Sequence, residues 1–146
     1  MPRLNSKQPV YIFRLSRSTH SLSLALCKVS AGFPSPADDY IEGRINFDDL
    51  LIKNKPATYL MRVTGESMIG AGIYSNDLMV VDRSLKPAHN KLVVACIEGE
   101  FTLKRFCIQS GKIVLKAENK NYSDIEINNE EEFSVFGVVT AIVRTF

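Results

Sequence analysis

The 146-residue sequence is poor in the side chains on which many active sites depend. It holds two histidines and three cysteines, and no two cysteines form a C-x-x-C pair. An odd number of isolated cysteines argues against a disulfide framework and against a zinc site, so we expect no metal and no other cofactor. His20 lies in a basic tail and His89 in a Pro/Asn turn. The sequence therefore offers no well-placed histidine for a Ser-His-Asp triad.

Long apolar runs and strong charge are also missing. No stretch approaches the ~18–20 apolar residues that a membrane helix needs. The net charge is +2, which is too small to indicate a nucleic-acid partner by itself. With 45% hydrophobic and 23% charged residues, the chain is typical of a soluble globular domain. We expect a cytoplasmic protein that does not associate with a membrane.

Acidic residues are absent from the first 31 positions. This serine-rich segment carries five basic residues, whereas residues 32–146 hold 13 basic and 16 acidic side chains and sum to −3. The contrast predicts a flexible basic arm over residues 1–31 and a folded domain over residues 32–146. Leucines alternate with small residues over 21–26, which is the period of a strand.

An export or transit peptide is the alternative interpretation of the arm, but its apolar patch is short and interrupted by serines. Lys28 follows that patch directly.

The rest of the chain has the pattern of short strands separated by turns. Strands are predicted over residues 59–63, 78–82, 92–97, 101–106, 112–116 and 133–143, and a short helix over 47–51. Glycine, asparagine and proline clusters lie between them. Many short strands without a long helical period predict a mostly β fold, a small antiparallel β-sandwich or partial barrel.

Ser67 is the candidate nucleophile. It lies in Thr64-Gly65-Glu66-Ser67-Met68, directly after a predicted strand, where turn amides can converge on an oxyanion. An ordinary turn serine is the alternative, because a hydroxyl is unreactive unless a base contacts it.

Lys104 is the candidate base, because it lies inside a predicted strand. Period two places it on one face with Thr102 and Phe106. Burial beside an aromatic ring would disfavour the ammonium and lower its pKa toward the range of a base. An exposed strand lysine is the alternative.

A third feature is the Ala31-Gly32 pair, because it joins two small residues ahead of Phe33-Pro34-Ser35-Pro36. The two X-Pro steps favour an extended backbone. Such a segment can lie in a cleft as a peptide substrate does.

Together these motifs resemble the UmuD family, whose members are related to the self-cleaving domain of the LexA repressor. The resemblance rests on Ala31-Gly32-Phe33-Pro34-Ser35-Pro36-Ala37, Gly65-Glu66-Ser67-Met68 and Glu100-Phe101-Thr102-Leu103-Lys104-Arg105. The spacings agree as well: Ser67 lies 35 positions after Gly32, and Lys104 lies 37 positions after Ser67. Alanine at position 31 is similar to LexA, whereas some UmuD relatives carry cysteine there.

The resemblance implies a LexA- or signal-peptidase-like fold and a serine endopeptidase with a Ser-Lys dyad. Ser67 would be the nucleophile, Lys104 the base, and Ala31-Gly32 the bond that the protein cuts in itself. It also implies a homodimer, stimulation by the RecA–single-stranded DNA filament in the SOS response, and a UmuC-like Y-family translesion polymerase as partner.

Two other functions remain open at this stage. One is a non-enzymatic dimeric regulatory subunit of the polymerase. The other is a LexA-like repressor, although residues 1–31 have no helix-turn-helix pattern. We therefore expect no direct sequence-specific DNA binding.

Overall fold

The computed structural model describes residues 21–25, 28–34 and 41–146. The chain divides into two compact units, residues 1–46 and 47–146, and each is described by itself. Residues 1–20 and 26–27 of the predicted arm lie outside the described part. The predicted boundary after residue 31 is a site of backbone cleavage rather than a division between folded units. It stays a prediction.

The first unit contains a two-stranded antiparallel sheet. Strand β1 (Leu22–Ala25) pairs with β2 (Ile41–Ile45), with Ser23 opposite Arg44. Arg44 adds a bond across the pair, because its Nε donates to Ser21 Oγ at 2.9 Å. The alternating leucines thus form the predicted strand, with β2 as its partner.

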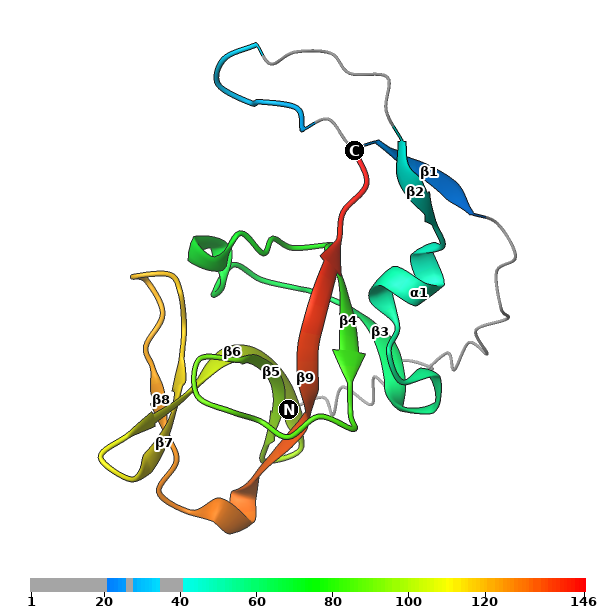
Figure 1. Cartoon of the computed structure of the whole chain (residues 1–146). Coiled ribbons are helices and arrows are strands. Elements are labelled where there is room, and N and C mark those ends of the chain that lie inside the picture. Colours follow the sequence, from blue (N-terminus) through cyan, green and yellow to red (C-terminus); the bar gives the residue numbers. More distant parts are fainter. Residues whose placement is uncertain (1–20, 26–27, 35–40) are drawn as a thin grey trace, which may run out of the picture. The chain divides into compact units, whose positions relative to one another are not determined.

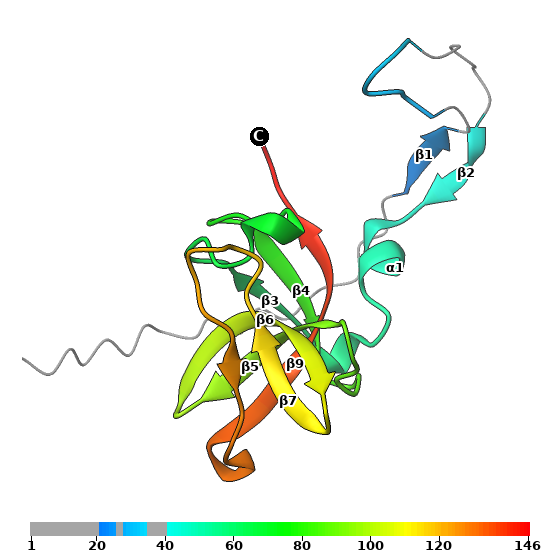
Figure 2. The same cartoon turned by 90° about the vertical axis from the view of Figure 1, so that its left-hand side faces the viewer.

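The second unit is built on a seven-stranded antiparallel sheet (Figure 1). Its strands are β3 (Thr58–Arg62), β4 (Leu78–Asp82), β5 (Leu92–Ile97), β6 (Glu100–Gln109), β7 (Lys112–Lys116), β8 (Ile125–Glu126) and β9 (Phe133–Val143). The order is β3-β4-β9-β5-β6-β7-β8. The mostly β fold is confirmed, and the sheet, strongly twisted in Figure 2, is not a closed barrel.

Short helices flank the strands. Helix α1 (Phe47–Leu51) confirms the predicted helix, and 3-10 turns lie at Lys55–Ala57, Ile69–Ala71 and Glu130–Glu132. In the described part of the chain, no helix is long and apolar enough to cross a membrane.

Strand β9 joins two halves of this sheet. It pairs with β4 on one side and with β5 on the other. One half contains β3 and β4, which come first in the sequence. The other half contains β5, β6, β7 and β8, which come later. Gly137 allows close packing here, because a Cβ at that position would lie 2.6 Å from Val81 Cγ1.

Two tight hairpins set the register of β5, β6 and β7. The connecting pairs are Glu98-Gly99 and Ser110-Gly111, and all four residues have positive φ, between 50° and 80°. Two-residue loops with positive φ at both positions match the right-handed twist of paired strands. These hairpins place Lys104 near the middle of β6, opposite Val93.

Apolar side chains form two buried clusters, and alternation along β5 contributes to both. Val94 belongs to the first cluster, whereas Val93 and Ala95 belong to the second. Because neighbouring residues of a strand point to opposite faces, the sheet is covered by apolar packing on both sides. Val81 and Leu115 are fully buried, one in each cluster.

Candidate active site

Ser67 lies in the turn that follows β3. Gly65 has a φ of +90°, a conformation that side chains disfavour, and it turns the chain away from the strand. Met68 is 2% exposed and packs in the first apolar cluster. The turn is therefore anchored by Met68, with Ser67 half-buried beside it.

Lys104 meets Ser67 from strand β6. Its Nζ donates to Ser67 Oγ at 3.0 Å, to Thr102 Oγ1 at 3.0 Å and to the Leu103 carbonyl oxygen at 3.0 Å. The predicted face is confirmed, because Thr102 lies beside Lys104 and Lys104 is buried with 7% exposure. Thus the structure brings together the two residues that the sequence singled out.

Burial changes the acid–base property of this lysine. Desolvation lowers the pKa of the Lys104 amine below its ordinary value of 10.5. All three of its hydrogen-bond partners in the described part of the chain are uncharged oxygens. With no carboxylate among them to favour the ammonium, Lys104 becomes neutral more easily than a free lysine.

The loop after β7 fixes the serine turn from the other side. The backbone N–H of Glu118 donates to the Ser67 carbonyl at 2.8 Å, and that of Gly70 donates to the Glu118 carbonyl at 2.7 Å. The Asn119 side chain donates to the Glu66 carbonyl at 2.9 Å. The sequence reasoning missed Glu118 and Asn119, because nothing in the sequence distinguishes them from surface residues.

A pocket of about 270 Å³ adjoins the serine. Its apolar lining comes from β3, β4, β5 and β6 together with the serine turn, and includes Met61, Met68, Met79, Val94 and Leu103. Such a pocket fits an apolar side chain next to a reacting carbonyl.

The predicted scissile pair lies in the first unit. Ala31 and Gly32 are exposed, and residues 31–33 form a bend rather than a helix. The flanking Val29 and Phe33 are 90% and 84% exposed. The backbone N–H of Phe33 donates to Ser30 Oγ at 3.1 Å. An exposed bend can enter a cleft without breaking a packed core.

His89 does not join this site. His89 is an exposed residue whose Nδ1 accepts a bond from the Ile108 N–H at 3.0 Å. His20 lies outside the described residues. Within the described residues, no group of three or more histidine, cysteine or acidic side chains could hold a metal ion.

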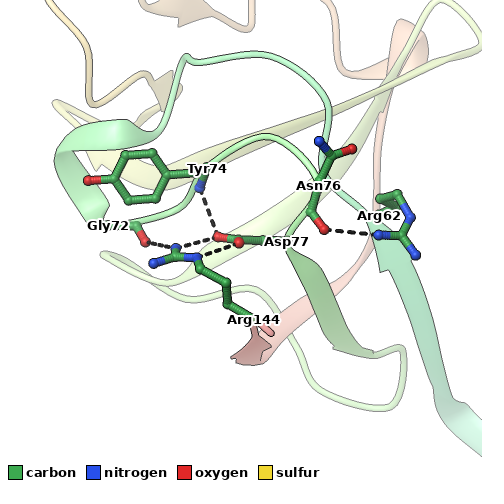
Figure 3. Close-up of polar contacts among 6 residues, drawn as sticks. All are labelled: Arg62, Gly72, Tyr74, Asn76, Asp77 and Arg144. Carbon is green, nitrogen blue, oxygen red and sulfur yellow. Dashed lines mark hydrogen bonds and ion pairs between the residues drawn. The ribbon is translucent and has the colours of Figure 1, made fainter. Parts of the chain in front are cut away.

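A cluster of polar contacts lies at the end of the loop between the serine turn and β4 (Figure 3). Arg144 donates to both carboxylate oxygens of Asp77, at 2.7 and 2.6 Å, and to the Gly72 carbonyl at 2.8 Å. The Tyr74 N–H also donates to Asp77, at 2.8 Å. Bonds from Arg144 and Tyr74 lower the pKa of the Asp77 carboxyl from 3.8 to about 2. Asp77 is 2% exposed and the Arg144 side chain is 36% exposed, and this partly buried ion pair holds residues 72–77 to the end of β9.

Comparison with known proteins assigns the chain to a class. The Peptidase S24-like family model matches residues 23–140, and the chain belongs to this family. This match confirms the peptidase-like class that the motifs predicted.

Individual relatives agree with that assignment. MucA of Salmonella typhimurium is 40% identical over 122 residues, which cover 83% of each protein. SamA of Salmonella typhimurium strain LT2 is 42% identical over 114 residues, 78% of this chain and 79% of SamA. The LexA repressor of Clostridium perfringens is 37% identical over 119 residues, 82% of this chain and 57% of the repressor. The predicted resemblance to UmuD-like proteins and to LexA is confirmed.

Proposed function

We propose that this protein is a serine endopeptidase that cuts its own Ala31-Gly32 bond with a Ser67-Lys104 dyad. The observation that carries the proposal is the 3.0 Å contact between Lys104 Nζ and Ser67 Oγ. That distance is within reach of direct proton transfer between a nucleophile and its base.

The neutral amine of Lys104 takes the proton of the Ser67 hydroxyl as the oxygen attacks the carbonyl carbon of Ala31. The resulting oxyanion is stabilised by backbone amides. Among the described residues, none accepts a hydrogen bond from the N–H of Ser67, so this N–H is available to the oxyanion. The ammonium of Lys104 then protonates the departing amine of Gly32. An ester between Ser67 and Ala31 remains, and water activated by Lys104 hydrolyses it.

The products would be the basic segment 1–31 and the domain 32–146. In keeping with the UmuD resemblance, the shortened domain would act as a cytoplasmic homodimer that regulates a UmuC-like Y-family translesion polymerase in the SOS response. The RecA–single-stranded DNA filament would stimulate the cut by favouring the closed state, a population shift rather than new chemistry. The domain has a charge of −3, so we expect weak affinity for duplex DNA.

The test is intact-mass spectrometry of purified full-length protein after incubation at pH values from about 7 to 10. We expect one cut, giving a domain that begins at Gly32. Ser67→Ala should stay full-length while folding normally, because covalent catalysis requires the hydroxyl.

Three results would contradict the proposal: a dominant cut elsewhere, continued cutting by Ser67→Ala, or no cut at any pH with or without the RecA filament. The last would favour a non-enzymatic regulatory subunit. Tight sequence-specific duplex binding would favour a LexA-like repressor.

A further inference from the structure

Glu118 connects the serine turn to the strand that carries the lysine. Its backbone holds the turn through the bonds from its N–H to the Ser67 carbonyl and from Gly70 to its own carbonyl. Its side chain forms an ion pair with Arg105 Nε. Arg105 directly follows Lys104 in β6. One residue thus contacts both the turn with the candidate nucleophile and the strand with the candidate base.

These contacts close a ring. Lys104 is joined to Arg105 by the peptide bond, Arg105 to Glu118 by the ion pair, Glu118 to Ser67 by the backbone bond, and Ser67 to Lys104 by the 3.0 Å side-chain bond. Arg105 is itself held in place, because its Nη1 donates to the Asn90 carbonyl at 2.7 Å. The ring leaves little freedom in the distance between the hydroxyl and the amine.

We propose that Arg105 and Glu118 are positioning residues, which hold the Ser67 hydroxyl against the Lys104 amine for the self-cleavage proposed above. The two side chains are 29% and 27% exposed. Ion pairs with this access to water contribute little to the free energy of unfolding. Their contribution is to geometry, and a displacement of about 1 Å at a reacting group lowers a rate by about 100-fold.

The proposal predicts a distinct pattern for Glu118→Gln, Arg105→Met and the double variant. Each single variant should slow self-cleavage by about 10- to 100-fold, because the residue that holds the turn is then no longer tied to β6 by the ion pair. The double variant should be no slower than the worse single variant, since either change opens the same ring. Urea unfolding midpoints, measured in the uncut Ser67→Ala background, should change little.

The pH profile separates positioning from a general structural role. When the serine turn moves away, water reaches the Lys104 amine and its pKa rises toward the ordinary value. The rise of the cleavage rate with pH should therefore shift to higher pH in Glu118→Gln and Arg105→Met. Glu118→Asp, which keeps the charge, should restore part of the rate and of the pH profile.

The Lys112–Glu126 ion pair supplies the matched control. It joins β7 and β8, its Nζ–Oε1 distance is 2.8 Å, and its side chains are 62% and 49% exposed. Glu126→Gln should leave both the rate and the pH profile unchanged. If wild-type protein is cut and the Glu118 and Arg105 variants match it in rate and profile, the positioning role is refuted. If wild-type protein is never cut, the proposed function itself fails.

Discussion

Replacing Gly70 by alanine tests how closely the serine turn must pack. A Cβ at position 70 would lie 2.5 Å from the Glu118 carbonyl oxygen and 3.2 Å from its carbonyl carbon. These are backbone atoms, which cannot swing aside as a side chain can. The serine turn must therefore move away from Glu118, and the 2.7 Å hydrogen bond from the Gly70 N–H to the Glu118 carbonyl is lost.

The cost can be worked from those contacts. A lost hydrogen bond is about 1 kcal/mol, and overpacking adds about 1–3 kcal/mol. The smaller entropy of an unfolded chain with alanine returns about 0.4–1 kcal/mol. We therefore expect a net loss of about 1–3.6 kcal/mol in the free energy of unfolding. Because the retreat carries Ser67 with it, self-cleavage should slow by at least about 10-fold.

Gly99→Ala is the control for this experiment. Gly99 has a φ of +80° and no atom within 4 Å of a built Cβ. Alanine there should lower the free energy of unfolding by about 1 kcal/mol through backbone strain, without touching the serine turn. Unfolding is followed by far-UV circular dichroism in urea, in the Ser67→Ala background, and cleavage by mass spectrometry. A Gly70→Ala protein that is as stable as its parent, or that is cut as fast as Gly99→Ala, would refute the reasoning.

Three further outcomes are expected. Because burial lowers the pKa of Lys104 below 10.5, the neutral fraction of Lys104 and the self-cleavage rate should rise between about pH 7 and pH 10. Lys104→Arg should be inactive over this whole pH range, because the guanidinium stays charged. Activity in that variant would exclude Lys104 as the base. Thr102→Val removes one acceptor of Lys104 Nζ and should slow self-cleavage by about 3- to 10-fold. Ser67→Ala, which should not be cut, is the negative control. An unchanged rate in Thr102→Val would show that Thr102 does not orient the amine. The folded pKa of Asp77, about 2 against 3.8, means that its ion pair stabilises the fold above about pH 4 and that this contribution is lost as the pH falls toward 2. Asp77→Asn should therefore have a lower thermal midpoint than the parent at pH 7, a difference that shrinks near pH 2, and a constant difference would contradict the assigned pKa.

The strands that the sequence predicted well are those with a strong local pattern. Residues 92–97 and 112–116 match β5 and β7, because each contains two adjacent β-branched residues and adjoins a glycine turn. Strand β2 was missed, since Ile41–Ile45 has a glycine at its centre and charged neighbours. Strand β8 has only two residues, Ile125–Glu126, and owes its pairing to β7.

The site shows the same division between local and long-range information. Ser67 and Lys104 were found because their motifs and spacing resemble a known family, and because alternation along β6 predicts burial of Lys104. Glu118 was missed, because its link to Ser67 is made by backbone atoms, which are the same in every residue. A contact that spans the chain and uses no special side chain leaves no pattern in a single sequence.

The position of β9 bears on the order in which the site is assembled. Ser67 follows β3 in one half of the sheet, Lys104 lies in the other half, and the strand that pairs with both halves is Phe133–Val143, near the C-terminal end of the described chain. During synthesis on a ribosome, the proposed nucleophile and the proposed base both emerge before the strand that pairs with β4 and β5. The nascent chain thus cannot complete this sheet until residues 133–143 have emerged. For the self-cleavage proposed above, this order would keep residues 1–31 attached until the sheet is complete.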